Sequence, residues 1–260
     1  MFCSSPRLNA LFAASLGLLF LCSSVATNVA HAFEGEDKAK IEQIIRSYLL
    51  ENPELMLEVQ QALETKQREQ AQLAAKQALE DNRDAIFSSP NQGEIGNPDG
   101  DVTVVEFFDY NCGFCRRAMD DMNALLEGDE NLKFVLKELP ILSQASVEAS
   151  RVSTAVYRLA PEQYGEFHNR LLSVNGQKDG AQALAIAQEM GLDVAAIEKE
   201  SRNEDINGAF QEASELATSL GVTGTPSYVI GDEVVFGALG TEVLRTKIEN
   251  VRKCGSTTCG

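Results

Sequence analysis

Basic residues are scarce in this chain, with 22 Lys and Arg against 39 Asp and Glu and a formal net charge of −17. So acidic a surface repels nucleic acids and anionic membranes, which argues against both as partners. Histidine is rarer still, with 2 in the chain, and His31 lies in a segment that we expect to be removed. Because His168 then remains alone, a zinc enzyme built on histidines is not expected.

Long apolar runs are also lacking, apart from residues 8–22 near the N-terminus. This run follows Arg7 and leads to Ala30-His-Ala32, an arrangement typical of a secretory signal peptide with a small-residue cleavage site. The run is too short to span a membrane comfortably. We therefore expect residues 1–32 to be a signal peptide that is cleaved after Ala32, with an uncleaved anchor as the alternative.

Cysteine is infrequent, with 6 in the chain, and two of these leave with the signal peptide. The others stand in two close pairs: Cys112, Cys115, Cys254 and Cys259. An even number of cysteines in an exported chain indicates an oxidising compartment.

Glycine is absent from residues 36–87, and proline occurs there once, at Pro53. This composition predicts a separate helical unit, residues 33–90, in which a first helix ends near Asn52 and a second begins at Pro53. The helices carry an apolar stripe at helical spacing: Ile41, Ile44, Ile45, Tyr48, Leu49, Leu55, Met56, Val59 and Leu63. Beyond Leu63 the sequence becomes polar on most faces, which predicts an exposed helix.

Two interpretations compete for this apolar stripe. It packs against the rest of the same chain, as most amphipathic helices do, or it meets its equivalents in other protomers. We favour self-association, because the stripe lies far from the redox motif in sequence and the polar stretch between them offers little surface for docking back. The spacing does not distinguish a dimer from a trimer, since fewer than three clean heptads are present.

The central stretch of the chain is residues 102–116, in which a β-branched apolar run leads into a Cys-x-x-Cys motif. Residues 102–108 have the composition of a buried strand, and residues 115–126 repeat apolar positions at helical spacing. A strand therefore delivers Cys112 to a helix N-terminus, where unpaired N–H groups and the helix dipole favour a thiolate. This is the geometry of a redox site.

The remaining pattern predicts the rest of a second domain, residues 91–260, and two turn clusters at residues 88–93 and 96–100 mark its boundary with the first. Residues 132–139 should form a strand parallel to the first, joined to it by a right-handed crossover. A helical insert of four or five helices is expected at about residues 143–220, with breaks near Pro161, Gly180, Gly191 and Asn203 and at residues 174–176. It precedes a hairpin with strands at 226–230 and 233–236. A last helix is expected at residues 242–252.

These features resemble the DsbA family of thiol-disulfide oxidoreductases. The resemblance rests on Cys112-Gly-Phe-Cys115, on Gly224-Thr-Pro-Ser227 before the hairpin and on the helical insert, and it covers about residues 91–252. Further phrases, such as Tyr48-Leu-Leu-Glu-Asn-Pro-Glu54 and Leu139-Pro-Ile-Leu142, are similar to the ScsC-type branch, which has N-terminal helices for self-association. The resemblance implies an α/β thioredoxin fold with an inserted helical subdomain, preceded by an extended N-terminal helical segment.

The resemblance also implies roles for the motif residues. Cys112 would be the nucleophile that carries the mixed disulfide, and Cys115, more deeply buried, would resolve it. A permanently closed structural disulfide is the alternative. Pro226 would be a cis-proline opposite Cys112, rather than an ordinary trans turn proline, and it would leave the Thr225 backbone free to pair with an extended substrate. Gly113 and Phe114 complete the expected substrate-binding set.

Glu106 lies where thioredoxin-fold enzymes carry a buried acid beneath the active site. Burial would raise the pKa of its carboxyl, which could then relay the proton of Cys115. Lys137 on the neighbouring strand is the expected ionic partner. Alternatively Glu106 points outward, because strand parity is easily misjudged from sequence.

The residues between the two motif cysteines, Gly113 and Phe114, bear on the direction of the reaction. Phe114 supplies no charge, so Cys112 should be less acidic than in the strongly oxidising members of the family, which have Pro-His there. Gly-Phe is closer to the Gly-Tyr of oligomeric periplasmic isomerases. We therefore expect disulfide isomerase or reductase character, and oligomerisation would raise the effective concentration of sites.

Cys254 and Cys259 at the C-terminus depart from the family pattern. We expect a second, local disulfide between them, with an exchange pair or a Cu(I) site as alternatives.

The leading hypothesis is a periplasmic oxidoreductase, working without a cofactor or metal on exported proteins and served by a membrane redox partner. A simple DsbA-like oxidase, a holdase and a copper-binding protein that uses Cys112 and Cys115 are the alternatives.

Overall fold

The computed structural model describes residues 36–260. The expected signal peptide, residues 1–32, lies outside the described residues. Within the described part, no helix combines the length and apolar character that a membrane span requires. The chain divides into two compact units, the first ending at Thr65 and the second running from Lys66 to Gly260.

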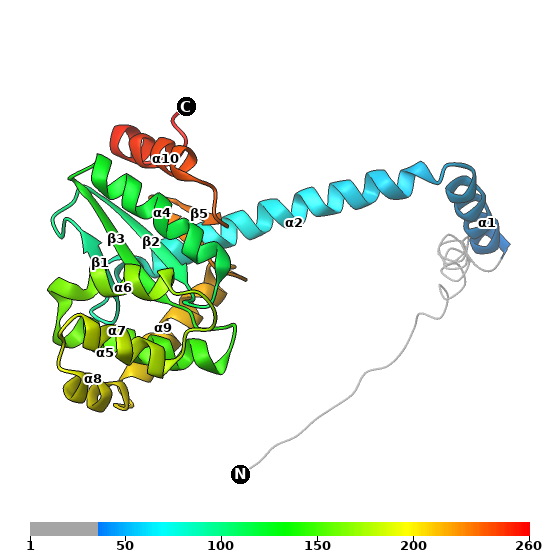
Figure 1. Ribbon diagram of the computed structural model, residues 1–260. Helices are drawn as coiled ribbons and strands as arrows, with labels where there is room; N and C mark the ends of the chain where they lie inside the picture. Colours follow the sequence, from blue (N-terminus) through cyan, green and yellow to red (C-terminus); the bar gives the residue numbers. More distant parts are fainter. Residues whose placement is uncertain (1–35) are drawn as a thin grey trace, which may run out of the picture. The chain divides into compact units, whose positions relative to one another are not determined.

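The first unit is helical, as its composition predicts. Helix α1 spans Glu36–Glu51 and α2 spans Glu54–Asp81, so that α2 continues into the second unit (Figure 1). The side chain of Asn52 closes α1 by donating to the carbonyl oxygen of Tyr48 at 2.8 Å. Pro53 separates the helices because its ring blocks a continuous helical turn. Both predicted helix boundaries are confirmed.

The apolar stripe of this first unit faces solvent in the single chain. Its most exposed members are Ile41, Ile44, Ile45, Tyr48, Met56, Val59 and Leu63, each at least 43% accessible. The polar stretch that follows, residues 66–74, is exposed as predicted. Within the first unit itself, these apolar side chains are therefore not buried.

The described part of the second unit is built on one five-stranded sheet of order β1-β3-β2-β4-β5. Strand β2 pairs in parallel with β3, and the other pairs are antiparallel. The predicted parallel pair and the predicted hairpin of β4 and β5 are confirmed. The strands span Gly93–Gly96, Val102–Phe108, Leu132–Glu138, Ser227–Ile230 and Glu233–Phe236.

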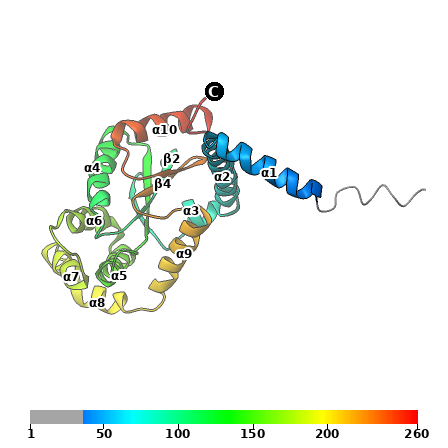
Figure 2. The ribbon, with the colours of Figure 1, turned by 90° about the vertical axis from the view of Figure 1, so that its right-hand side faces the viewer.

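Helices cover both faces of this sheet, as Figure 2 shows for α4 and α6 on one side and α3 and α9 on the other. The face that carries Val104, Phe108 and Leu136 packs against α4, α5, α6 and α10. The opposite face carries Val105, Phe107 and Val135 and packs against α3 and α9. The helices span α3 Arg83–Phe87, α4 Gly113–Gly128, α5 Gln144–Leu159, α6 Tyr164–Ser173, α9 Ile206–Ser219 and α10 Thr241–Cys254.

Strand β1 is an element that the sequence pattern does not predict. Its residues lie between turn signals and include two glycines, which are typical of loops. The ring of Tyr164 occupies the space that a Cβ at residue 93 would need. Gly93 is therefore required by the close approach of the helical insert to a strand, and not by a turn.

The boundary between the units differs from the one predicted near residue 90. Leu79 at the end of α2 and Ile86 in α3 are buried in the same cluster as Phe107 of β2. These side chains complete the core on one face of the sheet, so residues 66–90 belong to the second unit. The turn clusters at residues 88–100 mark a bend within the fold.

The insert between β3 and β4 contains five α-helices and a short 3₁₀ turn within residues 144–219. The predicted breaks near Pro161, Gly180, Gly191 and Asn203 are confirmed. The elements not yet given are η1 Pro161–Gln163, α7 Gly180–Glu189 and α8 Val194–Ser201.

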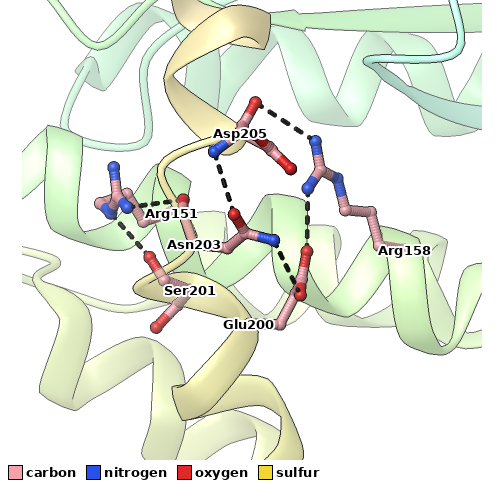
Figure 3. Close-up of polar contacts among 6 residues, drawn as sticks. All are labelled: Arg151, Arg158, Glu200, Ser201, Asn203 and Asp205. Atoms are coloured by element: carbon pink, nitrogen blue, oxygen red, sulfur yellow. Dashed lines mark hydrogen bonds and ion pairs between the residues drawn. The ribbon is translucent and has the colours of Figure 1, made fainter.

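Two arginines of α5 hold the turn between α8 and α9 (Figure 3). Arg151 donates to the carbonyl oxygens of Ser201 at 2.7 Å and Asn203 at 2.9 Å. Arg158 binds the carboxylate of Glu200 at 2.8 Å. The bonds of Arg151 satisfy backbone carbonyl groups at and just beyond the end of α8. Together, the two arginines anchor this part of the insert to α5.

Candidate active site

The active-site turn joins β2 to α4, and the carboxylate of Asp109 organises it. One oxygen of this carboxylate accepts from the backbone N–H of Asn111 at 2.8 Å, and the other accepts from that of Leu142 at 3.0 Å. The carbonyl oxygen of Asp109 accepts from the N–H of Cys112 at 3.0 Å. The turn therefore places Cys112 at the N-cap position of α4.

The sulfur of Cys112 is held in a site that favours its anionic form. Hydrogen bonding from Cys115 is the largest influence, and with Thr225 and the backbone N–H groups of Cys115 and Phe114 it lowers the pKa of Cys112 to about 5, although burial opposes this. The Cys112 thiol also lies 3.1 Å from the carbonyl oxygen of Thr225. The helix N-terminus thus acts on Cys112 as the sequence predicts.

Alkylation measures this acidity directly. The rate at which iodoacetamide modifies the reduced protein should follow the thiolate fraction and rise with a midpoint near pH 5, where an ordinary cysteine titrates near 8.5. Cys115→Ser removes the largest hydrogen bond to the sulfur, so its midpoint should lie at higher pH. A wild-type midpoint near 8.5 would contradict the described geometry.

Cys115 is chemically the opposite of Cys112. It is fully buried, and burial together with its hydrogen bond to Cys112 raises the pKa of its thiol well above the ordinary value. Cys112 and Cys115 differ less in exposure than the sequence predicts, because Cys112 itself is only 7% accessible. The two thiols differ mainly in acidity.

The loop before β4 faces the motif. The peptide bond between Thr225 and Pro226 is cis. The carbonyl oxygen of Pro226 accepts from the N–H of Gly237 at 2.9 Å, which holds the loop to the chain just after β5. The structure therefore brings Thr225 and Pro226 together with Cys112, although 113 positions separate Thr225 from that cysteine.

Glu106 lies beneath the site and is 3% accessible. Burial raises the pKa of its carboxyl to about 8, and the negative charges of Cys112 and Asp121 add to the effect. The expected partnership with Lys137 is wrong. Glu106 pairs in register with Leu136, so the next residue of β3, Lys137, points to the opposite face of the sheet, where it binds Glu212 at 3.0 Å.

The pKa of Glu106 makes a prediction about the stability of the reduced protein, in which Cys112 is already ionised at neutral pH. The carboxyl loses its proton near 4.5 when unfolded and near 8 when folded, so its stabilising contribution is complete at low pH and is lost as the pH rises through 8. Relative to wild type, Glu106→Gln should gain about 2 kcal/mol of unfolding free energy between pH 6 and pH 8. Urea denaturation measures this, and a pH-independent difference would count against it.

The two residues within the motif differ in exposure and surroundings. No atom lies within 4 Å of where a Cβ of Gly113 would stand. Phe114 is 57% accessible, and the guanidinium of Arg117 stacks over its ring at 4.3 Å. Phe114 thus presents an apolar ring to solvent near Cys112, and the guanidinium of Arg117 covers one face of that ring.

A buried polar cluster behind the turn is not predicted by the sequence. Tyr110 shares a hydrogen bond of 2.7 Å with Ser153 and one of 3.2 Å with Nδ1 of His168. Burial lowers the pKa of His168 to about 3, so the ring is neutral at physiological pH. His168 therefore packs between the sheet and the insert. The sequence does not predict this cluster, because Tyr110, Ser153 and His168 come from three segments that lie far apart in the chain.

Cys254 and Cys259 form a disulfide at the end of α10, with their Cα atoms 6.0 Å apart. Between residues 36 and 260, no group of three or more His, Cys, Asp or Glu side chains is arranged to hold a metal ion.

Comparison with known families gives two matches. The profile of the DSBA-like thioredoxin domain matches residues 103–249, and that of the copper resistance protein ScsC N-terminal domain matches residues 37–70. A thioredoxin-like oxidoreductase from Silicibacter pomeroyi DSS-3 is 38% identical with a TM-score of 0.63, over 66% of this chain and 99% of that one. Proteus mirabilis ScsC in a compact conformation is 27% identical with a TM-score of 0.64, over 84% and 99% of the two chains.

Two curated relatives match this chain at 23% and 27% identity. Disulfide bond formation protein D of Bacillus subtilis is 23% identical over 189 residues, which is 67% of this chain and 84% of that protein. The chain spans only 24% of the Na(+)/H(+) antiporter NhaA 1 of Salinispora arenicola, with 27% identity over 165 residues.

Proposed function

This chain belongs to the family of DsbA-like thioredoxin-domain oxidoreductases, and we propose that it is a periplasmic enzyme that exchanges disulfide bonds of exported proteins, with isomerase and reductase character. The observation that carries the proposal is the pairing of an acidic Cys112 with a buried, weakly acidic Cys115 opposite cis-Pro226. Such an asymmetric dithiol performs both steps of disulfide exchange.

The first step is attack by the Cys112 thiolate on a substrate disulfide. A bond forms between Cys112 and one substrate sulfur, while the other substrate sulfur leaves as a thiolate. An extended substrate would pair with the backbone at Thr225, next to Pro226, and Gly113 leaves room for it to approach.

The second step depends on the fate of the mixed disulfide. In reduction, Cys115 passes its proton to the buried Glu106, which acts as the relay. Cys115 then attacks the sulfur of Cys112, so that the Cys112–Cys115 disulfide forms and the second substrate sulfur leaves as a thiol. In isomerisation, a second substrate thiolate attacks the mixed disulfide instead and releases Cys112 unchanged. With a pKa of about 5, Cys112 is a thiolate at neutral pH, which is the form that makes the first attack in both reduction and isomerisation.

Self-association through the stripe of α1 and the start of α2 belongs to the same proposal. Its exposed members, Ile41, Ile44, Ile45 and Tyr48 in α1, recur at the spacing of one helix face. A second copy of the chain is the occupant that we propose, because identical stripes are complementary in an isologous contact. Linked protomers would then hold two or more dithiols near one substrate.

Point variants of the full chain test this assembly. Replacing both Ile44 and Tyr48 by aspartate places charges in the stripe and should give a monomer by light scattering, with loss of scrambled-ribonuclease reactivation but retained insulin reduction. Leu73→Asp is the matched control, since Leu73 is 69% accessible and lies outside the stripe. If wild type is already a monomer, the isomerase proposal fails and a simple oxidase takes its place.

A second function, Cu(I) binding by Cys112 and Cys115, is favoured by the match of residues 37–70 to the copper resistance protein ScsC N-terminal domain. Two thiolates are ligands that suit this soft ion. Titration of the reduced protein with Cu(I) against a competing chelator is the test, with the double variant C112S/C115S as control. Binding no tighter than that of an ordinary dithiol would dismiss this function.

A further inference from the structure

The loop between α6 and α7, residues 174–179, is clamped to the active-site turn. The side chain of Asn111, next to Cys112 in sequence, accepts from the backbone N–H of Lys178 at 2.7 Å and donates to the carbonyl oxygen of Lys178 at 2.8 Å. Arg116 in the first turn of α4 donates to the side chain of Asn175 at 2.9 Å. The loop is thus attached on both sides of Cys112.

This clamp brings a buried lysine to the site. Lys178 is 5% accessible, whereas most lysines keep their ammonium group in water. Burial is the main influence and lowers the pKa of Lys178, as does Arg116, while the negative charges of Asp109, Cys112 and Cys115 raise it. These negative charges stabilise its ammonium form against the effect of burial.

The available anions at this position are few. The carboxylate oxygens of Asp109 already accept from the backbone N–H groups of Asn111 and Leu142. Cys115 holds its proton because burial raises the pKa of its thiol. The negative charges of Asp109 and of the Cys112 thiolate therefore both act on Lys178. Of these two anions, the thiolate has no side chain with a full positive charge within its own Cys-Gly-Phe-Cys motif, since Phe114 carries none.

We propose that Lys178 is a positioning residue for disulfide exchange, which stabilises the Cys112 thiolate by its charge from a loop that Asn111 holds in place. This inference rests on the proposed function and deepens it. The helical insert then supplies the cation that the Cys-Gly-Phe-Cys motif lacks. The sequence carries no sign of this role, because Lys178 lies 66 positions beyond Cys112 in a loop.

The charge acts on the redox equilibrium as well as on the rate. When glutathione reduces the protein, two glutathione thiols become one glutathione disulfide and the Cys112–Cys115 bond becomes a dithiol. Cys115 keeps one of the two thiol protons, and the other is released to solvent because Cys112 is ionised. A cation beside Cys112 stabilises only the product side, so it shifts this equilibrium toward the dithiol. Removing the cation should shift it back.

Other groups facing the sulfur remain the same in each variant. They come from β2, the active-site turn, α4 and β4: Glu106, Asp109, Cys115, Arg116 and Tyr228. A change on altering Lys178 alone is therefore assigned to its own charge.

The test compares Lys178→Met with Lys178→Arg in the full chain. Loss of the charge should lower the acid dissociation constant of Cys112 about threefold, read as a higher midpoint in iodoacetamide alkylation, because the charge acts through a partly solvated path. The equilibrium constant for reduction by glutathione should fall by a similar factor. Lys178→Arg should restore both, and Lys199→Met, on exposed α8 surface, should change neither.

A folded Lys178→Met protein with the wild-type midpoint and equilibrium would overturn the proposal. If that variant does not fold, Asn111→Ala keeps the lysine but releases its loop and should raise the midpoint by a smaller amount; an unchanged midpoint there also overturns it. These readouts need no substrate protein, so they separate a failure of this inference from a failure of the proposed exchange activity.

Discussion

Replacing Cys112 by serine is expected to abolish disulfide exchange, with insulin reduction falling by at least about 1,000-fold. A serine hydroxyl is neither ionised nor a nucleophile toward sulfur at neutral pH, whereas the Cys112 thiol has a pKa of about 5 and is a thiolate there. Loss of turnover in this variant tests the first chemical step without altering the other thiol.

Cys115→Ser should behave differently. Cys112 can still attack, but no buried thiol is present to resolve the mixed disulfide, so substrate should remain covalently attached and be visible on non-reducing gels. The double variant C254S/C259S serves as the matched control for loss of two sulfurs, and it should retain activity because that disulfide lies at the end of α10.

The same variants address a binding protein that works without exchange. If Cys112→Ser loses insulin reduction and still suppresses aggregation as well as wild type does, binding of unfolded chains is independent of disulfide exchange. Turnover that survives in Cys112→Ser would contradict the assigned nucleophile.

Glu212→Leu is expected to destabilise the protein by about 3–5 kcal/mol, because it leaves a buried charge without its partner. Lys137 is 2% accessible and donates to Glu212 at 3.0 Å and to the carbonyl oxygen of Ala85 in α3. Glu212 also accepts from Ser89 at 2.9 Å and Asn91 at 3.1 Å. Urea denaturation measures the loss.

The pKa shifts of Lys137 and Glu212 show how burial and hydrogen bonding act on each partner of this pair. Burial lowers the pKa of Lys137 despite the raising effect of Glu212. Burial likewise opposes ionisation of Glu212, yet hydrogen bonds from Ser89, Asn91 and Lys137 together lower its pKa. The carboxylate of Glu212 is also more exposed to solvent than the ammonium of Lys137. Removing Glu212 therefore leaves a buried ammonium group without an anionic partner.

A double variant separates the lost pairing from lost packing. Lys137→Met combined with Glu212→Leu should recover much of the stability, because no unpaired charge remains. The control is Glu198→Leu, which removes the exposed i,i+4 pair with Arg202 and should cost less than about 1 kcal/mol. Equal losses for Glu212→Leu and Glu198→Leu would contradict the importance of the buried pair.

Local patterns were sufficient for most elements of the fold. The β-branched run of β2, the turn residues at the ends of the insert helices and Pro53 each act within a few residues, and the predicted strands, helices and breaks are confirmed there. The position of Glu106 six residues before Cys112 predicts its place beneath the site. The sequence does not predict which residue lies beside Glu106, because the register of two strands decides whether neighbouring residues share a face.

The sequence alone determined the Cys-x-x-Cys motif at a helix N-terminus, the family and the apolar stripe of the first unit, since motif spacing and helical periodicity are properties of nearby residues. Only the tertiary structure decided that β1 is a strand, that α3 completes the core, that Lys137 binds Glu212 and that the backbone of Lys178 is held by Asn111. Each of these depends on contacts between residues far apart in the chain, whose distance is set by packing of the whole domain.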